Sequence, residues 1–241
     1  MPPVSPAHKI PPRERLIFAL DVPDLAAAKK LVGTLGDAVV FYKIGLELAT
    51  SAHYFELLSW LVERDNKVFA DWKLYDIPAT VAAATRQLAR SGASFLTVHG
   101  DRAVVEAAAG EKGERLKVLA VTVLTSVAPG DLKDMGVTLP LDAFVEQRAK
   151  RALEAGADGV IASGLEAARL RAALGAAALI VTPGIRLADT KGGDDQRRIV
   201  TPTRALEAGA DHIVVGRPIR DAADPRRAAL SIQHEIAALL G

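Results

Sequence analysis

The sequence predicts an α/β protein with a single catalytic domain, folded as a (β/α)8 barrel, which is the TIM-barrel architecture. Two observations predict it: a joint between a helix and a strand that recurs along the chain, and eight short apolar runs separated by helical patterns. At Gly92, Gly156 and Gly209 a helical pattern ends, and a β-branched run begins within two or three residues. Glycine just past a helix adopts the left-handed conformation at little cost. Repeated tight joints of this kind indicate βα units and a parallel sheet.

The eight apolar runs are nearly continuous, as expected for strands that are covered on both faces. They begin near Leu16, Val39, Val68, Phe95, Val118, Gly159, Leu179 and His212. Helical patterns lie between them, over residues 24–35, 52–64, 79–90, 102–109, 142–155, 165–174, 202–208 and 224–239. Pro78 suits the start of a helix, where its missing N–H costs nothing. An open, doubly wound sheet is the alternative, but no Gly-x-Gly-x-x-Gly follows the first strand.

Composition narrows the class of protein. The chain has 241 residues, of which half are hydrophobic, and no Pro/Gly/Ser-rich linker divides it. We therefore expect a barrel over residues 15–241, preceded by a flexible, proline-rich arm over residues 1–14. A net charge of +1 argues against nucleic-acid and membrane partners, and the lack of cysteine excludes disulfides and thiol nucleophiles. With no run of about 18 apolar residues and no signal-peptide core, the chain is expected in the cytoplasm.

The third apolar run ends in a polar stretch, Asp71-Trp72-Lys73-Leu74-Tyr75-Asp76. Side chains two apart on a strand share a face, so Asp71 and Lys73 should point the same way, and Asp76 should follow in the turn before the next helix. The pattern predicts a lysine ammonium between two carboxylates. Such a lysine stays charged and suits a proton donor. A purely structural ion pair at the end of a strand is the alternative.

In a (β/α)8 barrel, function lies at the carboxyl ends of the strands. In chain order, the polar residues and glycines at those ends are Asp21, Lys43, Asp71, Lys73, Asp76, His99, Thr125, Ser126, Ser163, Gly164, Gly184, Arg186, Gly216 and Arg217. Arginines and glycines after strands seven and eight are typical of a phosphate site, because glycine lets N–H groups approach an anion that arginine binds bidentately. The polar segment 188–196 between them is expected to be a lid over the phosphate, or otherwise a disordered insertion. The five histidines have no metal-binding spacing, so no metal site is expected.

With these motifs the chain resembles the orotidine 5′-monophosphate decarboxylases over about Leu16 to Ile232. The resemblance rests on separated segments: Phe18-Ala19-Leu20-Asp21, Tyr42-Lys43-Ile44-Gly45, Asp71 to Pro78, Val121 to Ser126, Thr182 to Arg186, Asp195 to Arg198, and Val215 to Pro218. It implies a barrel of the ribulose-phosphate-binding type. It also implies decarboxylation of orotidine 5′-monophosphate (OMP) to uridine 5′-monophosphate (UMP), in de novo pyrimidine biosynthesis and without a cofactor. The family pattern is usually Gly-Asp-Gln where this chain has Asp194-Asp195-Gln196.

The resemblance also implies a role for each site residue. Lys73 would be the proton donor to C6 of the pyrimidine, Asp71 would lie against the substrate carboxylate, and Lys43 would link the ribose to the charged array. Asp21 would contact the ribose and uracil end, and Thr125 would read the pyrimidine.

Further roles concern the phosphate and a second subunit. The phosphate contacts would be Arg186, Gln196, Gly216 and Arg217. Asp76, with Ile77 and Thr80 beside it, would enter the site of a partner subunit, so the resemblance implies a homodimer with shared active sites.

Two other functions remain open at this point. A sugar-phosphate decarboxylase or hexulose-phosphate synthase of the same superfamily would use Mg²⁺, but those enzymes tend to carry a glutamate ligand where this chain has Lys43, and a cation beside a dication is unfavourable. A barrel that only binds a nucleotide is the more distant alternative. The complete Asp71, Lys73 and Asp76 set argues against it.

Overall fold

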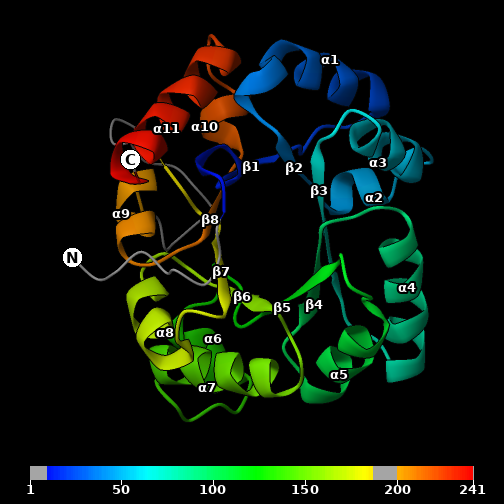
Figure 1. Cartoon of the computed structure of the whole chain (residues 1–241). Helices are drawn as coiled ribbons and strands as arrows, with labels where there is room; N and C mark the ends of the chain where they lie inside the picture. Colours follow the sequence, from blue (N-terminus) through cyan, green and yellow to red (C-terminus); the bar gives the residue numbers. More distant parts are fainter. Residues whose placement is uncertain (1–9, 187–199, 241) are drawn as a thin grey trace.

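The structure, a computed structural model, describes residues 10–186 and 200–240. Eight parallel strands close into a barrel in sequence order, and the helices surround them (Figure 1). The strands are β1 (Leu16–Ala19), β2 (Phe41–Ile44), β3 (Lys67–Leu74), β4 (Phe95–His99), β5 (Lys117–Val121), β6 (Gly159–Ile161), β7 (Leu179–Thr182) and β8 (His212–Val215). The predicted fold class is confirmed, and the alternative of an open doubly wound sheet is excluded because β1 pairs with β8.

The helices follow the predicted patterns, with short additional ones. They are α1 (Leu25–Leu35), α2 (Leu46–Ala49), α3 (Tyr54–Val62), α4 (Pro78–Arg90), α5 (Arg102–Glu111), α6 (Pro129–Asp134), α7 (Leu141–Glu154), α8 (Ala167–Leu174), α9 (Pro202–Glu207), α10 (Arg217–Arg220) and α11 (Pro225–Leu240), with 3₁₀ turns η1 (Pro12–Glu14) and η2 (Gly36–Ala38). Helices α2, α6 and α10 were not predicted, because helices of four to six residues are too short to show a helical period.

The repeated joints have the conformation that was predicted. The glycine is left-handed in each, with φ of +87° at Gly92, +97° at Gly156 and +98° at Gly209. In the second and third joints an aspartate follows the Gly-Ala pair and accepts a hydrogen bond from the preceding strand. Asp158 accepts from the Val118 N–H, and Asp211 accepts from the Ile180 N–H, each at 2.9 Å. The joint therefore ties each new strand to its neighbour.

The interior of the barrel is closed by an apolar layer. Its largest members are Phe41, Phe69 and Phe95, whose rings meet with centroids 4.9 Å (Phe41–Phe95) and 5.8 Å (Phe69–Phe95) apart. A larger apolar cluster fills the space between the strands and the helices. Because side chains alternate along a strand, the inward positions two residues after these phenylalanines are occupied by Lys43, Asp71 and Thr97. The apolar layer thus forms a floor beneath polar side chains.

Part of the predicted amino-terminal arm packs against the barrel. Of the predicted arm, residues 1–9 lie outside the described residues, whereas residues 10–14 include η1, and Ile10 packs against the inner apolar layer. His212 Nδ1 lies 2.9 Å from the Glu14 carbonyl oxygen, which holds η1 at the base of the barrel. Within the described ranges, none of the helices combines the length and apolar character needed to cross a bilayer.

Candidate active site

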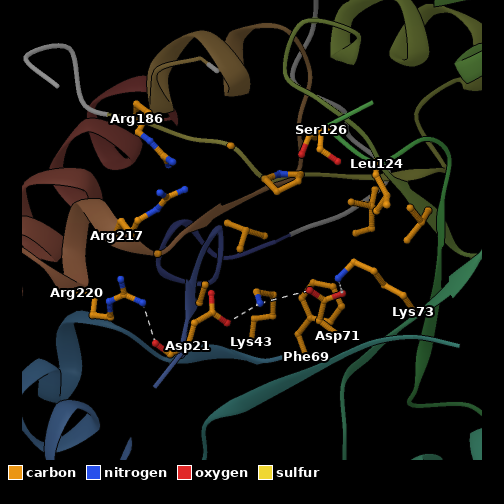
Figure 2. A pocket seen from close by; sticks show the side chains of 18 of the residues that line it. Asp21, Lys43, Phe69, Asp71, Lys73, Leu124, Ser126, Arg186, Arg217 and Arg220 are labelled. Atoms are coloured by element: carbon orange, nitrogen blue, oxygen red, sulfur yellow. Dashed lines mark hydrogen bonds and ion pairs between the residues drawn. The ribbon is translucent and has the colours of Figure 1, made fainter. Parts of the chain in front are cut away.

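A pocket of about 500 Å³ opens where the strands of the barrel finish (Figure 2). Of the predicted site residues it contains Asp21, Lys43, Asp71, Lys73, Thr125, Arg186, Gly216 and Arg217. Its apolar lining includes Ala19, Phe69, Val121, Ile161 and Val214. The volume lies within the usual range of small-molecule sites.

Four charged side chains form a continuous row across the pocket. Lys43 Nζ lies 3.1 Å from Asp21 Oδ1 and 3.4 Å from Asp71 Oδ2. Lys73 Nζ donates to Asp71 Oδ1 at 2.8 Å. Positive and negative groups therefore alternate from Asp21 to Lys73, and each inner member of the row contacts two groups of opposite charge.

Within a single chain, this arrangement differs from one expectation. The sequence pattern predicted a lysine between two carboxylates, but within the described chain it is the carboxylate of Asp71 that lies between two lysines. Asp76 is exposed, and its Oδ1 accepts the Ile77 N–H at 2.6 Å. The reason is that β3 ends at Leu74, so Asp76 falls beyond the strand and outside the pocket.

The row sets the charge states of its buried members. Burial alone would raise the pKa of Asp71, but the ammonium groups of Lys43 and Lys73 outweigh it and hold the pKa below its usual value. Burial likewise opposes the charged form of Lys43, but the carboxylates of Asp71 and Asp21 outweigh it and raise the pKa. Both groups are therefore ionised at neutral pH.

The opposite end of the pocket is cationic. Figure 2 shows Arg186, Arg217 and Arg220 together at one end, and Lys73 at the other. Gly184, with φ of +77°, sits in the lining before Arg186 and has a backbone conformation that L side chains rarely adopt. Three guanidinium groups at one end of a pocket suit a dianion such as a phosphate monoester.

Two functional residues were missed from the sequence. Arg220 donates to the Asp21 carbonyl oxygen at 2.9 Å, and it stands three residues after Arg217 on a helix too short to be recognised. Thr97 donates to Asp71 Oδ1 at 2.8 Å and is hidden inside an apolar run. The available signal was the inward alternation on β4, which places Thr97 two positions after Phe95.

The surroundings of Lys43 also bear on metal binding. In residues 10–186 and 200–240, no three His, Cys, Asp or Glu side chains group in a way that could hold a metal ion. The Lys43 ammonium lies between Asp21 and Asp71, the two carboxylates that a divalent cation in this row would need. An ammonium in that position would repel a dication.

Comparison with known proteins gives a clear family. Residues 14–232 match the family described as orotidine 5′-phosphate decarboxylase / HUMPS. The chain is 53% identical over 227 residues to an orotidine 5′-phosphate decarboxylase of Methylococcus capsulatus, covering 94% of this chain and 93% of that protein. It is 54% identical over 233 residues to one of Xanthomonas oryzae pv. oryzae, covering 95% and 94%. The chain belongs to the orotidine 5′-phosphate decarboxylase / HUMPS family.

Solved structures of the orotidine 5′-phosphate decarboxylase family agree in fold. The crystal structure from Lactobacillus acidophilus is similar with a TM-score of 0.82 and 37% identity, over 92% of this chain and 99% of that one. The structure from Pyrococcus horikoshii OT3 has a TM-score of 0.73 and 28% identity over the same shares. The predicted family and its enzyme class, a carboxy-lyase, are confirmed.

The family resemblance had assigned twelve site residues, and the structure brings eight of them into one pocket. Asp76, Ile77 and Thr80 are exposed at the start of α4 and do not line it. Gln196, together with the predicted lid over 188–196, lies outside the described residues. Arg186 and Val200 are the described residues on either side of this gap, and the Arg186 N–H donates to the Val200 carbonyl oxygen at 3.0 Å.

Proposed function

We propose that this chain decarboxylates OMP to UMP, with Lys73 as the proton donor to C6 and without a cofactor. The observation that carries the proposal is the distribution of charge in the pocket. A fixed ammonium in an alternating charge row lies at one end, and a cluster of arginines lies at the other. A nucleotide with a remote phosphate and a carboxylate on its base matches both ends.

The chemistry requires such an ammonium. Breaking the bond between C6 and the carboxylate releases CO2 and leaves the electron pair on C6, in the plane of the ring, where no π system accepts it. A positive charge fixed at that point stabilises the developing carbanion. Lys73 then gives a proton to C6, forming the C–H bond of UMP, and its neutral amine regains a proton from water.

The remaining row would keep the Lys73 ammonium in place. Asp71 holds it at 2.8 Å and is itself fixed by Lys43 at 3.4 Å, so little reorganisation is needed as charge develops. At the other end, Arg186 and Arg217 would hold the phosphate. Binding energy from that remote group can be used to order the reacting end.

We further propose that the active protein is a homodimer with shared sites, in which Asp76 serves the partner's pocket. Two large apolar side chains that flank Asp76 support this, since Tyr75 and Ile77 are each 66% exposed. Exposed apolar groups beside a functional loop are typical of a surface that another chain covers. The cytoplasmic location expected from the sequence remains a prediction.

The alternative function is that of a Mg²⁺-dependent sugar-phosphate enzyme, because the family description also names HUMPS. The position of Lys43 between Asp21 and Asp71 favours the metal-independent decarboxylase. The deciding assay is spectrophotometric turnover of OMP with and without EDTA. We expect undiminished turnover in EDTA, whereas full loss that Mg²⁺ restores would favour the alternative.

The role of Lys73 is tested by Lys73→Ala, which should lower kcat at least about 1,000-fold because both the fixed charge and the proton donor are lost. UMP has no carboxylate, so its Kd should change by less than about fivefold. The matched control is Lys67→Ala, at the opposite end of the same strand, where Lys67 pairs with Glu14. The control should keep full activity, and near-normal kcat in Lys73→Ala would contradict the assigned role.

A further inference from the structure

The ladder between β3 and β4 is interrupted beside the pocket. Ala70 pairs with Leu96, and the next pair is Leu74 with Val98. Three residues of β3 therefore lie opposite one residue of β4, which is Thr97. Extra residues of this kind bend a strand and redirect its side chains, and they are frequent near active sites.

The interruption includes an uncommon backbone conformation. Lys73 has φ of +47°, one of two positive values among the non-glycine residues that the structure describes. A residue with a Cβ is disfavoured in this region, so the surroundings must hold it there. The Lys73 N–H, which a regular ladder would have given to a backbone carbonyl, instead donates to the Thr97 hydroxyl oxygen at 3.0 Å.

The Thr97 hydroxyl makes a second contact in the same place. A hydroxyl has one proton to donate and can also accept. Since the Lys73 N–H is a donor, Thr97 Oγ1 must accept there, and its own proton is left for Asp71 Oδ1 at 2.8 Å. That same carboxylate oxygen accepts from Lys73 Nζ at 2.8 Å.

The result is a closed ring of contacts around the lysine. One oxygen atom, Thr97 Oγ1, bonds both the main chain of Lys73 and the carboxylate that holds its ammonium. Thr97 is 0% exposed, so water cannot replace the hydroxyl. In contrast, the Lys73 side chain is 30% exposed and points into the pocket, which leaves its position dependent on these contacts.

We infer that Thr97 is a positioning residue for the proton donor: its hydroxyl fixes both the backbone from which Lys73 projects and the carboxylate that orients the ammonium. The inference rests on the proposed function, because decarboxylation is the reaction that Lys73 would serve. Thr97 does not line the pocket, so its influence is on geometry and not on contact with the substrate.

The test compares Thr97→Val, which keeps the shape and removes the hydroxyl, with Thr97→Ser, which keeps the hydroxyl. Thr97→Val should lower kcat for OMP about 100-fold, the size of effect that a displacement near 1 Å produces. The Kd of UMP should stay within about threefold, because the phosphate and base contacts are unchanged. Thr97→Ser should recover kcat to within about fivefold of wild type.

A second readout follows the proton without CO2 release. In D2O the neutral Lys73 amine would take the C6 proton of UMP, leaving the electron pair on C6, and would return a deuteron after exchange with solvent. Thr97→Val should slow this exchange in parallel with kcat, and Thr97→Ser should restore it. A role in packing alone would leave the exchange rate of the bound, folded variant unchanged.

The matched control is Thr85→Val. Thr85 on α4 is also 0% exposed, and its hydroxyl has no hydrogen-bond partner in the described part of the chain. This variant should keep wild-type kcat and exchange. If Thr97→Val fails to fold, the pair Thr97→Ala and Thr97→Ser makes the same comparison, since the two differ by the hydroxyl alone.

The outcomes separate this inference from the proposed function. Wild-type protein that does not decarboxylate OMP contradicts the function, and with it the reaction that Thr97 would serve. Active wild type with unchanged kcat in Thr97→Val overturns the inference alone. The inference is also overturned if Thr97→Ser loses as much kcat as Thr97→Val does. It is overturned as well if Thr97→Val loses UMP affinity by the same factor as kcat.

Discussion

Replacing Asp71 with asparagine should destabilise the ligand-free protein. Asp71→Asn keeps the size of the side chain but removes the charge between Lys43 and Lys73, which lie 3.4 and 2.8 Å away. Two ammonium groups then face each other across the site. The row as a whole changes from neutral to a net charge of +1.

The magnitude follows from how deeply each charge is buried. Removing one partner of a fully buried pair costs about 3–5 kcal/mol. Lys43 keeps Asp21 at 3.1 Å and the Lys73 side chain is 30% exposed, so the loss should be smaller, about 2–3 kcal/mol. For a chain of this length that corresponds to a Tm lower by roughly 4–12 °C.

The pH dependence of this loss also follows. The pKa of Asp71 is lowered in the folded protein, so its stabilisation is complete above the unfolded value, about 3.9, and disappears as the pH falls through the lower folded value. The pKa of Lys43 is raised, so its stabilisation is complete below about 10.4 and disappears as the pH rises through the folded value. The difference between wild type and variant should therefore be constant from pH 5 to pH 7, where Asp71 is ionised in the folded and the unfolded wild type.

The assay is urea denaturation of wild type and Asp71→Asn at pH 5, 7 and 9, followed by circular dichroism without any nucleotide. The control is Asp37→Asn, the same chemical change at an exposed pair where Asp37 lies 2.6 Å from Arg226. Because water and salt screen that pair, its midpoint should not move measurably. Equal stability of Asp71→Asn and wild type at pH 7, or a difference that fades between pH 7 and pH 5, would refute the reasoning.

Other predictions concern the remaining parts of the site. Arg217→Ala should weaken UMP about 10- to 100-fold, as expected for lost hydrogen bonds to a charged group, and leave uridine nearly unchanged; calorimetry of both ligands tests this, and equal weakening would place Arg217 away from the phosphate. The free energy of unfolding of Lys73→Gly should exceed that of Lys73→Ala by about 1 kcal/mol, because glycine tolerates the positive φ at residue 73. Urea denaturation tests this, and equal midpoints would mean that this backbone is unstrained. Mixing Lys73→Ala with Asp76→Ala subunits should restore activity, with one working site per mixed dimer, because one site then carries both changes and the other carries neither. Verified subunit exchange without recovered activity would exclude the shared site.

Much of the fold was determined by local sequence. The barrel followed from apolar runs and glycine-containing joints, because a left-handed glycine after a helix and a continuous apolar strand are properties of a few consecutive residues. The order of the strand ends also placed Asp21, Lys43 and Asp71 together, since function lies at the carboxyl ends of the strands in this fold. The resemblance to the family followed from the order of the motifs that contain these residues along the chain.

The relations between strands were decided by the tertiary structure. Spacing within one segment predicted Asp71 and Asp76 on either side of Lys73, but the actual neighbours of Asp71 include Lys43 from β2 and Thr97 from β4. The irregular ladder at Lys73 depends on how β3 and β4 align, and no residue of β3 alone reveals it. Local sequence determines which way a side chain faces. The partners it meets across the barrel lie 22 to 26 residues away in the chain, as for Lys43 with Asp21 and Thr97 with Lys73 and Asp71. Such partners are selected by register and packing, which exist only once the barrel has closed.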